Sequence, residues 1–145
     1  MAARVKVRAA IWVGDKLVVH SSSRLGKERM TLPGGWVGRR ESVTDALVRE
    51  VQEELGIIVE VNDLLCAAEI INSSTRQDVE LIFAVTTPGT LNPSQVTLVD
   101  PTGPQADRVL PPVLTQLAEQ REAVASGGHT PLWLGNLYRV GHKHA

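Results

Sequence analysis

The sequence predicts an α+β fold, a mixed β-sheet combined with two helices, in a single domain over residues 1–145. Two apolar, β-branched runs, "VKVRAAIWV" and "KLVVHSS", flank Gly14-Asp15 as the strands of a hairpin would. An amphipathic segment with helical spacing ends before Gly56, and a second one follows Pro111-Pro112, which is a good helix start. A chain of 145 residues is long enough to bury a hydrophobic core between these elements.

The remaining elements are predicted from patterning further along the chain. "IIVEVNDLLCAAEIINSS" and "QDVELIFAVTT" are sheet segments, whereas "RLGKERMTLPGG" is predicted to be a basic, flexible connection. Residues 87–112 hold six of the eight prolines, so we expect mostly loop there, around a short strand at Gln95–Val99. The second helix, "VLTQLAEQREAVAS", stops at Gly127-Gly128, and "PLWLGNLYRV" returns to the sheet before a frayed tail.

The composition argues against large charged partners. Lys and Arg number 15 against 16 Asp and Glu, and the formal net charge of -1 favours neither a nucleic-acid polymer nor an anionic membrane. Small molecules fit better, and a homodimer is left open. Cys66 is the only cysteine and lies in an apolar run, which indicates a buried structural thiol. No secretory leader is recognisable and no apolar run approaches the roughly 18 residues that span a bilayer, so we expect a cytoplasmic protein.

The first helix carries an unusual charge pattern. Ser42 is a good N-cap and Gly56 a good C-terminal stop, which predicts a helix that begins near Val43 and has about thirteen residues. With about 100° per residue, three glutamates form one ridge that overlaps the edge of the apolar side instead of lying opposite it. The ridge consists of Glu50, Glu53 and Glu54.

Three neighbouring carboxylates in the C-terminal half of a helix repel each other and oppose the helix dipole. A plain amphipathic helix would place them on the solvent side, so a broken local rule of this kind indicates a site. A bound divalent cation would offset the repulsion, because Mg²⁺ or Mn²⁺ prefers carboxylate oxygens and completes its shell with water and substrate phosphates.

The stretch "GGWVGRRESVTDALVREVQEELGI" resembles the Nudix box, which reads G, five residues, E, seven residues, R-E-U-x-E-E-x-G-U, where U is aliphatic. Every specified position matches, and "TLPGGW" resembles the family's lead-in. The matching residues are Gly35, Glu41, Arg49, Glu50, Val51, Glu53, Glu54, Gly56 and Ile57. The resemblance implies a Nudix α/β/α sandwich and a Mg²⁺-dependent pyrophosphohydrolase that acts on a nucleoside diphosphate linked to a group X.

The resemblance also implies roles for the matched residues. Glu50 and Glu54 would hold the metal ions, and Glu53 would be a further ligand or the base that deprotonates water. Gly35 would add its carbonyl oxygen to the metal shell. Arg49 would pair with and orient the glutamates, and Glu41 would fix the preceding loop.

Other residues have weaker support. Asp100 and Asp107, in the later loop, are alternative general bases. Many family members carry glycine just before the first glutamate of the box, where this chain has Arg39-Arg40.

The candidates for substrate contact are basic or aromatic. For phosphate contacts we consider Arg24, Lys27 and Arg29, with ordinary surface charge as the alternative. For base stacking we consider Trp36, with plain packing as the alternative. Arg76 is a weaker phosphate candidate. His142 and His144 resemble a metal pair only superficially, and the sequon at Asn72 has no secretory context.

The group X is not fixed by the sequence. After the box, "IINSSTRQD" lacks both the proline typical of ADP-ribose pyrophosphatases and the tyrosine typical of diadenosine polyphosphate hydrolases. A nucleoside triphosphate or a nucleotide sugar is the expected substrate. The alternatives are a Nudix-fold module that senses a nucleotide without turnover, and a structural domain with an accidental match.

Overall fold

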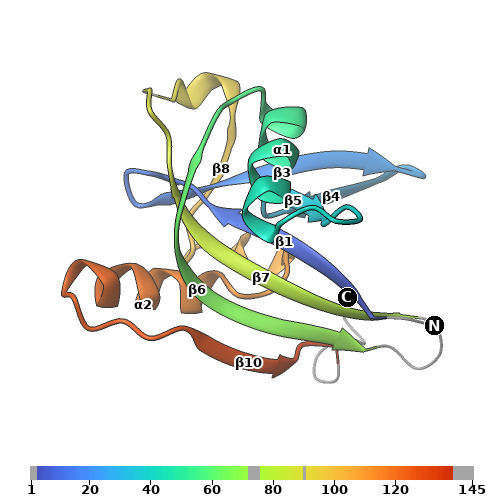
Figure 1. Ribbon diagram of the computed structural model, residues 1–145. Helices are drawn as coiled ribbons and strands as arrows, with labels where there is room; N and C mark the ends of the chain where they lie inside the picture. The colour runs from blue at the N-terminus through green and yellow to red at the C-terminus, as the bar shows by residue number, and fades with distance from the viewer. Residues whose placement is uncertain (1–2, 72–75, 90, 139–145) are drawn as a thin grey trace.

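The computed structural model describes residues 3–71, 76–89 and 91–138 (Figure 1). It confirms the predicted α+β class. The helices are α1 (Val43–Leu55) and α2 (Leu114–Ala125), with short 3-10 turns η1 (Pro93–Gln95) and η2 (Ala106–Arg108). The strands are β1 (Arg4–Ala10), β2 (Trp12–Val13), β3 (Lys16–Arg24), β4 (Lys27–Thr31), β5 (Gly34–Trp36), β6 (Glu60–Ile71), β7 (Gln77–Thr86), β8 (Thr97–Val99), β9 (Val109–Leu110) and β10 (Leu132–Asn136).

The strands form two mixed sheets. One has the order β10-β6-β7-β1-β5, and the other has the order β2-β3-β4-β9 with β8 paired to β3. The predicted hairpin around Gly14 is confirmed for β2 and β3. The earlier part of the same apolar run, β1, belongs to the other sheet, where it pairs in parallel with β7 and antiparallel with β5.

The two helices cover different parts of the core. Ala46, Leu47 and Val51 of α1 pack in one buried cluster with Val7 and Ala9 of β1. The α2 residues pack in a second cluster that includes Ala10 of the same strand. Because successive residues of a strand point to opposite faces, β1 contributes to both clusters. In Figure 1, α1 lies against β1 and β5 and α2 lies below, beside β6.

The prediction of a flexible connection at residues 24–35 is wrong. Lys27–Thr31 form β4, which pairs antiparallel with β3 across a two-residue turn. Both turn residues, Leu25 and Gly26, have positive φ, as this type of hairpin turn requires. The proline-rich segment is mostly loop, as predicted, with its strand at Thr97–Val99. The return to the sheet is also confirmed, because β10 pairs with β6. Within the described ranges no helix is long and apolar enough to cross a membrane.

Candidate active site

Helix α1 begins and ends where its capping residues predict. The Ser42 hydroxyl accepts a hydrogen bond from the Asp45 amide at 3.1 Å and so satisfies one free donor of the first turn. At the other end Gly56 adopts a left-handed conformation with φ 69°, and its amide donates to the Gln52 carbonyl. These caps set which residues face β5, and the glutamates of the last two turns lie beside that strand.

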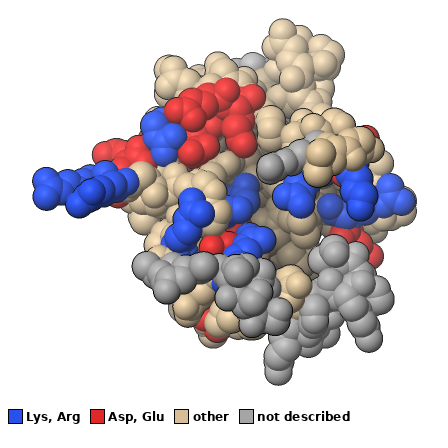
Figure 2. Space-filling model, turned by 90° about the vertical axis from the view of Figure 1, so that its right-hand side faces the viewer, with Lys and Arg blue, Asp and Glu red and all other residues tan. Residues whose placement is uncertain are grey.

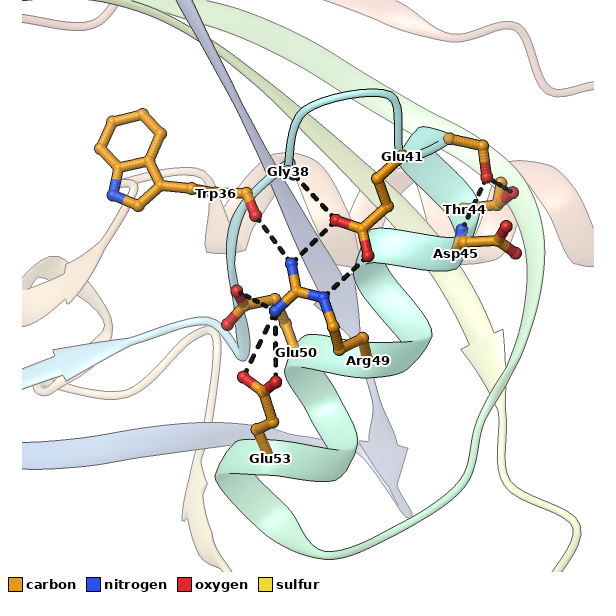
Figure 3. Close-up of polar contacts among 9 residues, drawn as sticks. Trp36, Gly38, Glu41, Thr44, Asp45, Arg49, Glu50 and Glu53 are labelled. Carbon is orange, nitrogen blue, oxygen red and sulfur yellow. Dashed lines mark hydrogen bonds and ion pairs between the residues drawn. The ribbon is translucent and has the colours of Figure 1, made fainter.

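Arg49 links the loop before the helix to the glutamates on it (Figure 3). Its guanidinium donates to both carboxylate oxygens of Glu41, at 2.8 and 2.9 Å, and to the Trp36 carbonyl at 3.2 Å. Its third nitrogen donates to Glu50 at 3.0 Å and to both oxygens of Glu53 at 3.3 Å. A planar guanidinium suits such bidentate contacts, so one side chain holds three carboxylates in a fixed arrangement.

Two of the ridge glutamates lie against the glycines of β5. The Glu54 carboxylate accepts the Gly34 amide at 2.8 Å. At Gly35, a Cβ atom would lie 2.5 Å from the nearer oxygen of Glu50, which is too close for any side chain. Gly35 therefore leaves room for the Glu50 carboxylate, whereas Gly34 lets β5 approach β1, where a Cβ atom would lie 1.9 Å from the Val7 carbonyl oxygen. Glu50 and Glu54 are mostly enclosed, with side chains 18% and 20% exposed, whereas Glu53 is 59% exposed.

The pKa values of Glu41 and Glu54 are shifted in opposite directions. Hydrogen bonds from Arg49 and from the Gly38 amide lower the pKa of Glu41 to about 2, so that it is ionised at neutral pH. Burial raises the pKa of Glu54, and the nearby Glu50 adds to this effect, while the Gly34 hydrogen bond and His20 oppose it. The Nε2 atom of His20, on β3, lies 3.9 Å from a Glu54 oxygen.

The donor set fits a hard divalent cation, although the carboxylates do not close a cage. Over the part of the chain that the structure describes, no three acidic, His or Cys side chains converge closely enough to hold a metal ion. The reason is visible in the contacts, because Glu50 and Glu53 face Arg49 while Glu54 faces the Gly34 amide. Mg²⁺ usually needs only one or two protein carboxylates besides water and phosphate, so Glu50 and Glu54 beside Gly35 satisfy its preference.

The loop before the helix departs from the usual box at Arg40. This residue has φ 61°, in the left-handed region that favours glycine, and it is one of two such non-glycine residues in the described chain. An arginine here holds a conformation that costs roughly 1–2 kcal/mol for a residue with a Cβ atom. The loop is nevertheless tied down, because Glu41 accepts the Gly38 amide at 2.8 Å.

The residues considered for substrate contact lie in different places. Lys27 and Arg29 are exposed on β4, in the hairpin at the right of Figure 1, and Arg24 is described only through its backbone at the end of β3. Trp36 has its carbonyl in the Arg49 network, but cations already cover its ring: Arg4 lies 3.5 Å and Lys6 4.3 Å from the ring centre. Two cations thus already contact the ring considered for base stacking.

Among the described residues, the alternative bases Asp100 and Asp107 form no hydrogen bond with Arg49 or its glutamates. Asp100 accepts the Thr102 amide and hydroxyl, which lower its pKa, and so closes its own turn. Asp107 lies exposed in η2. Cys66 is buried, as predicted, and burial raises its pKa to about 12. His142 and His144, together with the Asn72 sequon, lie outside the described residues.

Sequence reasoning missed the charged residues of β1 and β7. The Arg8 guanidinium pairs with Glu80 at 3.0 Å and donates to the Leu32 carbonyl at 3.0 Å, just before the glycines of β5. Arg76 donates to Asp78, and both carboxylates are buried. The alternation of cations in "RVKVR" was the available signal, because it predicts that Arg4, Lys6 and Arg8 share one face of a strand.

A comparison with known protein families assigns the chain to the same family that the Nudix box predicts. The NUDIX domain model matches residues 3–109, which include both sheets' first strands, the glycines of β5 and all of α1. The chain belongs to the NUDIX family. The family that the box predicted is thereby confirmed. No curated protein matches the chain significantly.

Several solved structures resemble this one along most of the chain. The E. coli ORF135 protein is 25% identical, with a TM-score of 0.64 over 88% of this chain and 94% of its own. The MutT NUDIX hydrolase from Burkholderia pseudomallei is 27% identical, with a TM-score of 0.54 over 68% and 82%. An ADP-ribose pyrophosphatase from Streptococcus suis, at 24% identity and a TM-score of 0.59 over 90% and 98%, shows the likeness of fold.

Proposed function

We propose that this Nudix protein is a metal-dependent pyrophosphohydrolase that cleaves a phosphoanhydride bond in a nucleoside diphosphate linked to X. The expected substrates are nucleoside triphosphates or nucleotide sugars, and the expected ion is Mg²⁺, with Mn²⁺ as a substitute. One observation supports this most strongly: Glu50 and Glu54 lie against Gly34 and Gly35, where no side chain separates the carboxylates from the strand backbone.

In this proposal Glu50 and Glu54 hold the metal, with the Gly35 carbonyl as a further oxygen donor. When bound, the ion supplies charge neutralisation on the phosphate oxygens and a lower pKa for a coordinated water. Hard cations favour such an all-oxygen donor set.

The other residues have complementary roles. Glu53 is the most exposed carboxylate of the ridge, so it can accept a proton from water without losing a buried contact. Arg49 orients Glu50 and Glu53, and Glu41 fixes Arg49 against the loop through two hydrogen bonds. A proton bound at Glu53 would weaken its attraction to Arg49, which would still keep its contacts to Glu41.

A turnover screen tests the proposal. The purified protein is incubated with nucleoside triphosphates, ADP-ribose, dinucleoside polyphosphates and nucleotide sugars, with Mg²⁺, Mn²⁺ or EDTA. We expect release of a nucleoside monophosphate, phosphate or pyrophosphate from at least one compound, only with metal. Glu54→Gln should abolish turnover, whereas Glu119→Gln, an exposed glutamate on α2, serves as the matched control.

Two outcomes would contradict the proposal. Full activity of Glu54→Gln in a correctly folded protein would rule out the assigned carboxylate site. Nucleotide binding by calorimetry with no turnover under either metal would instead support the alternative, a binding module that senses a nucleotide.

A further inference from the structure

The face of β1 that carries Arg4, Lys6 and Arg8 is charged, although it belongs to a central strand. In the sheet register, Lys6 lies between Trp36 of β5 and Glu80 of β7, and Arg4 lies opposite Asp78. Figure 2 shows acidic side chains grouped in the upper part of one face of the molecule, with lysine and arginine side chains below and beside them. A face with both signs of charge so close together can engage a metal and an anion at once.

Lys6 forms no ion pair with the described carboxylates, although Glu80 and Asp78 attract it from a greater distance. Its ammonium lies 4.3 Å from the centre of the Trp36 ring, and no carboxylate oxygen of the described residues lies within 4.0 Å of it. The residues outside the described ranges contain no Asp or Glu. Burial lowers the pKa of Lys6, and the Arg8 guanidinium lowers it further. A half-buried cation of this kind gains from an anionic partner.

The neighbouring carboxylates, Glu80 and Asp78, already form ion pairs with other cations. Glu80 pairs with Arg8 at 3.0 Å and lies 4.0 Å from Arg76, which also donates to Asp78. Among the described residues, Arg4 and Lys6 are the two cations of this face that form no ion pair with either carboxylate. Arg4 and Lys6 are the pair held over the indole ring, where cation–π attraction fixes their position without neutralising them.

This cation–indole cluster (Arg4, Lys6 and Trp36) is joined directly to the proposed catalytic network. The Trp36 carbonyl accepts a hydrogen bond from Arg49 at 3.2 Å, and Trp36 follows Gly35 along the chain. An anion on the cluster would thus lie at one end of β5, and the Glu54 contact to Gly34 lies at the other. Gly34 and Trp36 are two residues apart along the strand, which is roughly 7 Å at 3.3 Å per residue and is comparable with a short phosphate chain.

We propose that the cation–indole cluster binds a phosphoryl group of the substrate other than the two joined by the cleaved bond. The inference rests on the proposed function and narrows it. A nucleoside triphosphate has such a third phosphoryl group, whereas a nucleotide sugar has only the two phosphoryl groups of its diphosphate. The cluster therefore favours nucleoside triphosphates.

Calorimetry without metal tests the binding step alone. Inorganic tripolyphosphate is titrated in EDTA into the full chain as wild type, Lys6→Met and Lys16→Met, the last being an exposed lysine at the β2–β3 turn. We expect Lys6→Met to weaken Kd at least fivefold and Lys16→Met to change it less than twofold. Lys6→Arg should restore most of the affinity. Equal affinity in wild type and Lys6→Met, or no binding to wild type at millimolar concentration, would overturn the inference.

A substrate comparison with Mg²⁺ tests selectivity. For Lys6→Met and the more exposed Arg4→Met, kcat/KM for UTP should fall about tenfold, mainly through KM, while kcat/KM for UDP-glucose changes less than twofold. Equal losses on both substrates, or wild-type turnover of UDP-glucose without UTP, would overturn the inference and leave the proposed hydrolase intact. Absence of all turnover would refute the proposed function, and the calorimetric result would still decide the cluster. Unchanged melting temperatures exclude misfolding as the cause of a loss.

Discussion

Two arginines, Arg8 and Arg49, both pair with glutamates, but in opposite environments. Arg8 is 6% exposed, its partner Glu80 is 2% exposed, and the pair ties β1 to β7. The Arg49 side chain is 38% exposed and spreads its hydrogen bonds over Glu41, Glu50 and Glu53. The comparison teaches that the same chemical pairing holds the fold in one place, where water is excluded, and orients partly exposed carboxylates in the other.

Breaking the buried pair should give the largest effect on stability. Glu80→Gln leaves Arg8 buried beside a neutral group, and loss of one partner of a buried ion pair costs about 3–5 kcal/mol. Urea denaturation gives the free energy of unfolding and so measures this cost. The double variant Arg8→Met/Glu80→Met should recover much of the loss, because neither charge is then left unpaired. A single-variant cost below about 1 kcal/mol would contradict the comparison.

Removing Arg49 should affect activity far more than stability. Arg49→Met is expected to lower kcat/KM about 100-fold, because Glu50 and Glu53 lose their orientation, and to change the unfolding free energy by less than about 1 kcal/mol, because the pairs are solvent-screened. Steady-state kinetics and urea denaturation of the same sample separate the two quantities. A stability loss as large as that of Glu80→Gln would show that the exposed network also holds the fold.

The Arg40 position tests whether the exposed loop carries backbone strain. Arg40→Gly should raise the unfolding free energy by up to about 1 kcal/mol, since glycine adopts positive φ without the Cβ penalty but is more flexible when unfolded. Thermal denaturation checks this. Arg39→Gly, at the adjacent residue with no positive φ, should be neutral or slightly destabilising. Equal effects of the two changes would show that the left-handed conformation costs nothing there.

The smallest expected effect is the loss, at low pH, of the contribution that Glu41 makes to stability. Because its pKa is lowered to about 2 in the folded protein from about 4.5 unfolded, the stabilisation it contributes is fully present above about pH 4.5 and is lost as the pH falls through 2. The difference in melting temperature between wild type and Glu41→Gln should thus be constant from pH 8 to 5 and shrink between pH 4.5 and 2. A difference that shrinks already between pH 7 and 5 would contradict the assigned pKa.

Local signals predicted helix α1 well. Ser42 and Gly56 define a helix that the structure places at Val43–Leu55, and the spacing of the glutamates brings them to the edge of the core. The resemblance to the box implied the pairing of Arg49 with the glutamates. That pairing depends on where the loop returns, because Arg49 contacts Glu41 eight residues earlier and Trp36 thirteen residues earlier.

Long-range pairing explains what sequence reasoning missed. Arg8 and Glu80 lie 72 positions apart, so no window of the sequence contains both. The strand β4 was mistaken for a flexible connection because four of the first five residues after Gly26 are polar, and its exposed alternation supplies little hydrophobic signal. The turn at Leu25-Gly26 was the clue, since glycine at positive φ is typical of a tight hairpin.

The parallel pairing of β1 with β7 has a consequence for the order in which the chain is made. Arg4 is opposite Asp78 and Ala10 is opposite Ala84, so β1 is synthesised more than seventy residues before this parallel partner exists. Synthesis at about 5–20 residues per second makes that wait several seconds. The antiparallel partner β5 follows much earlier, so during the wait only the edge of β1 that will meet β7 remains unpaired.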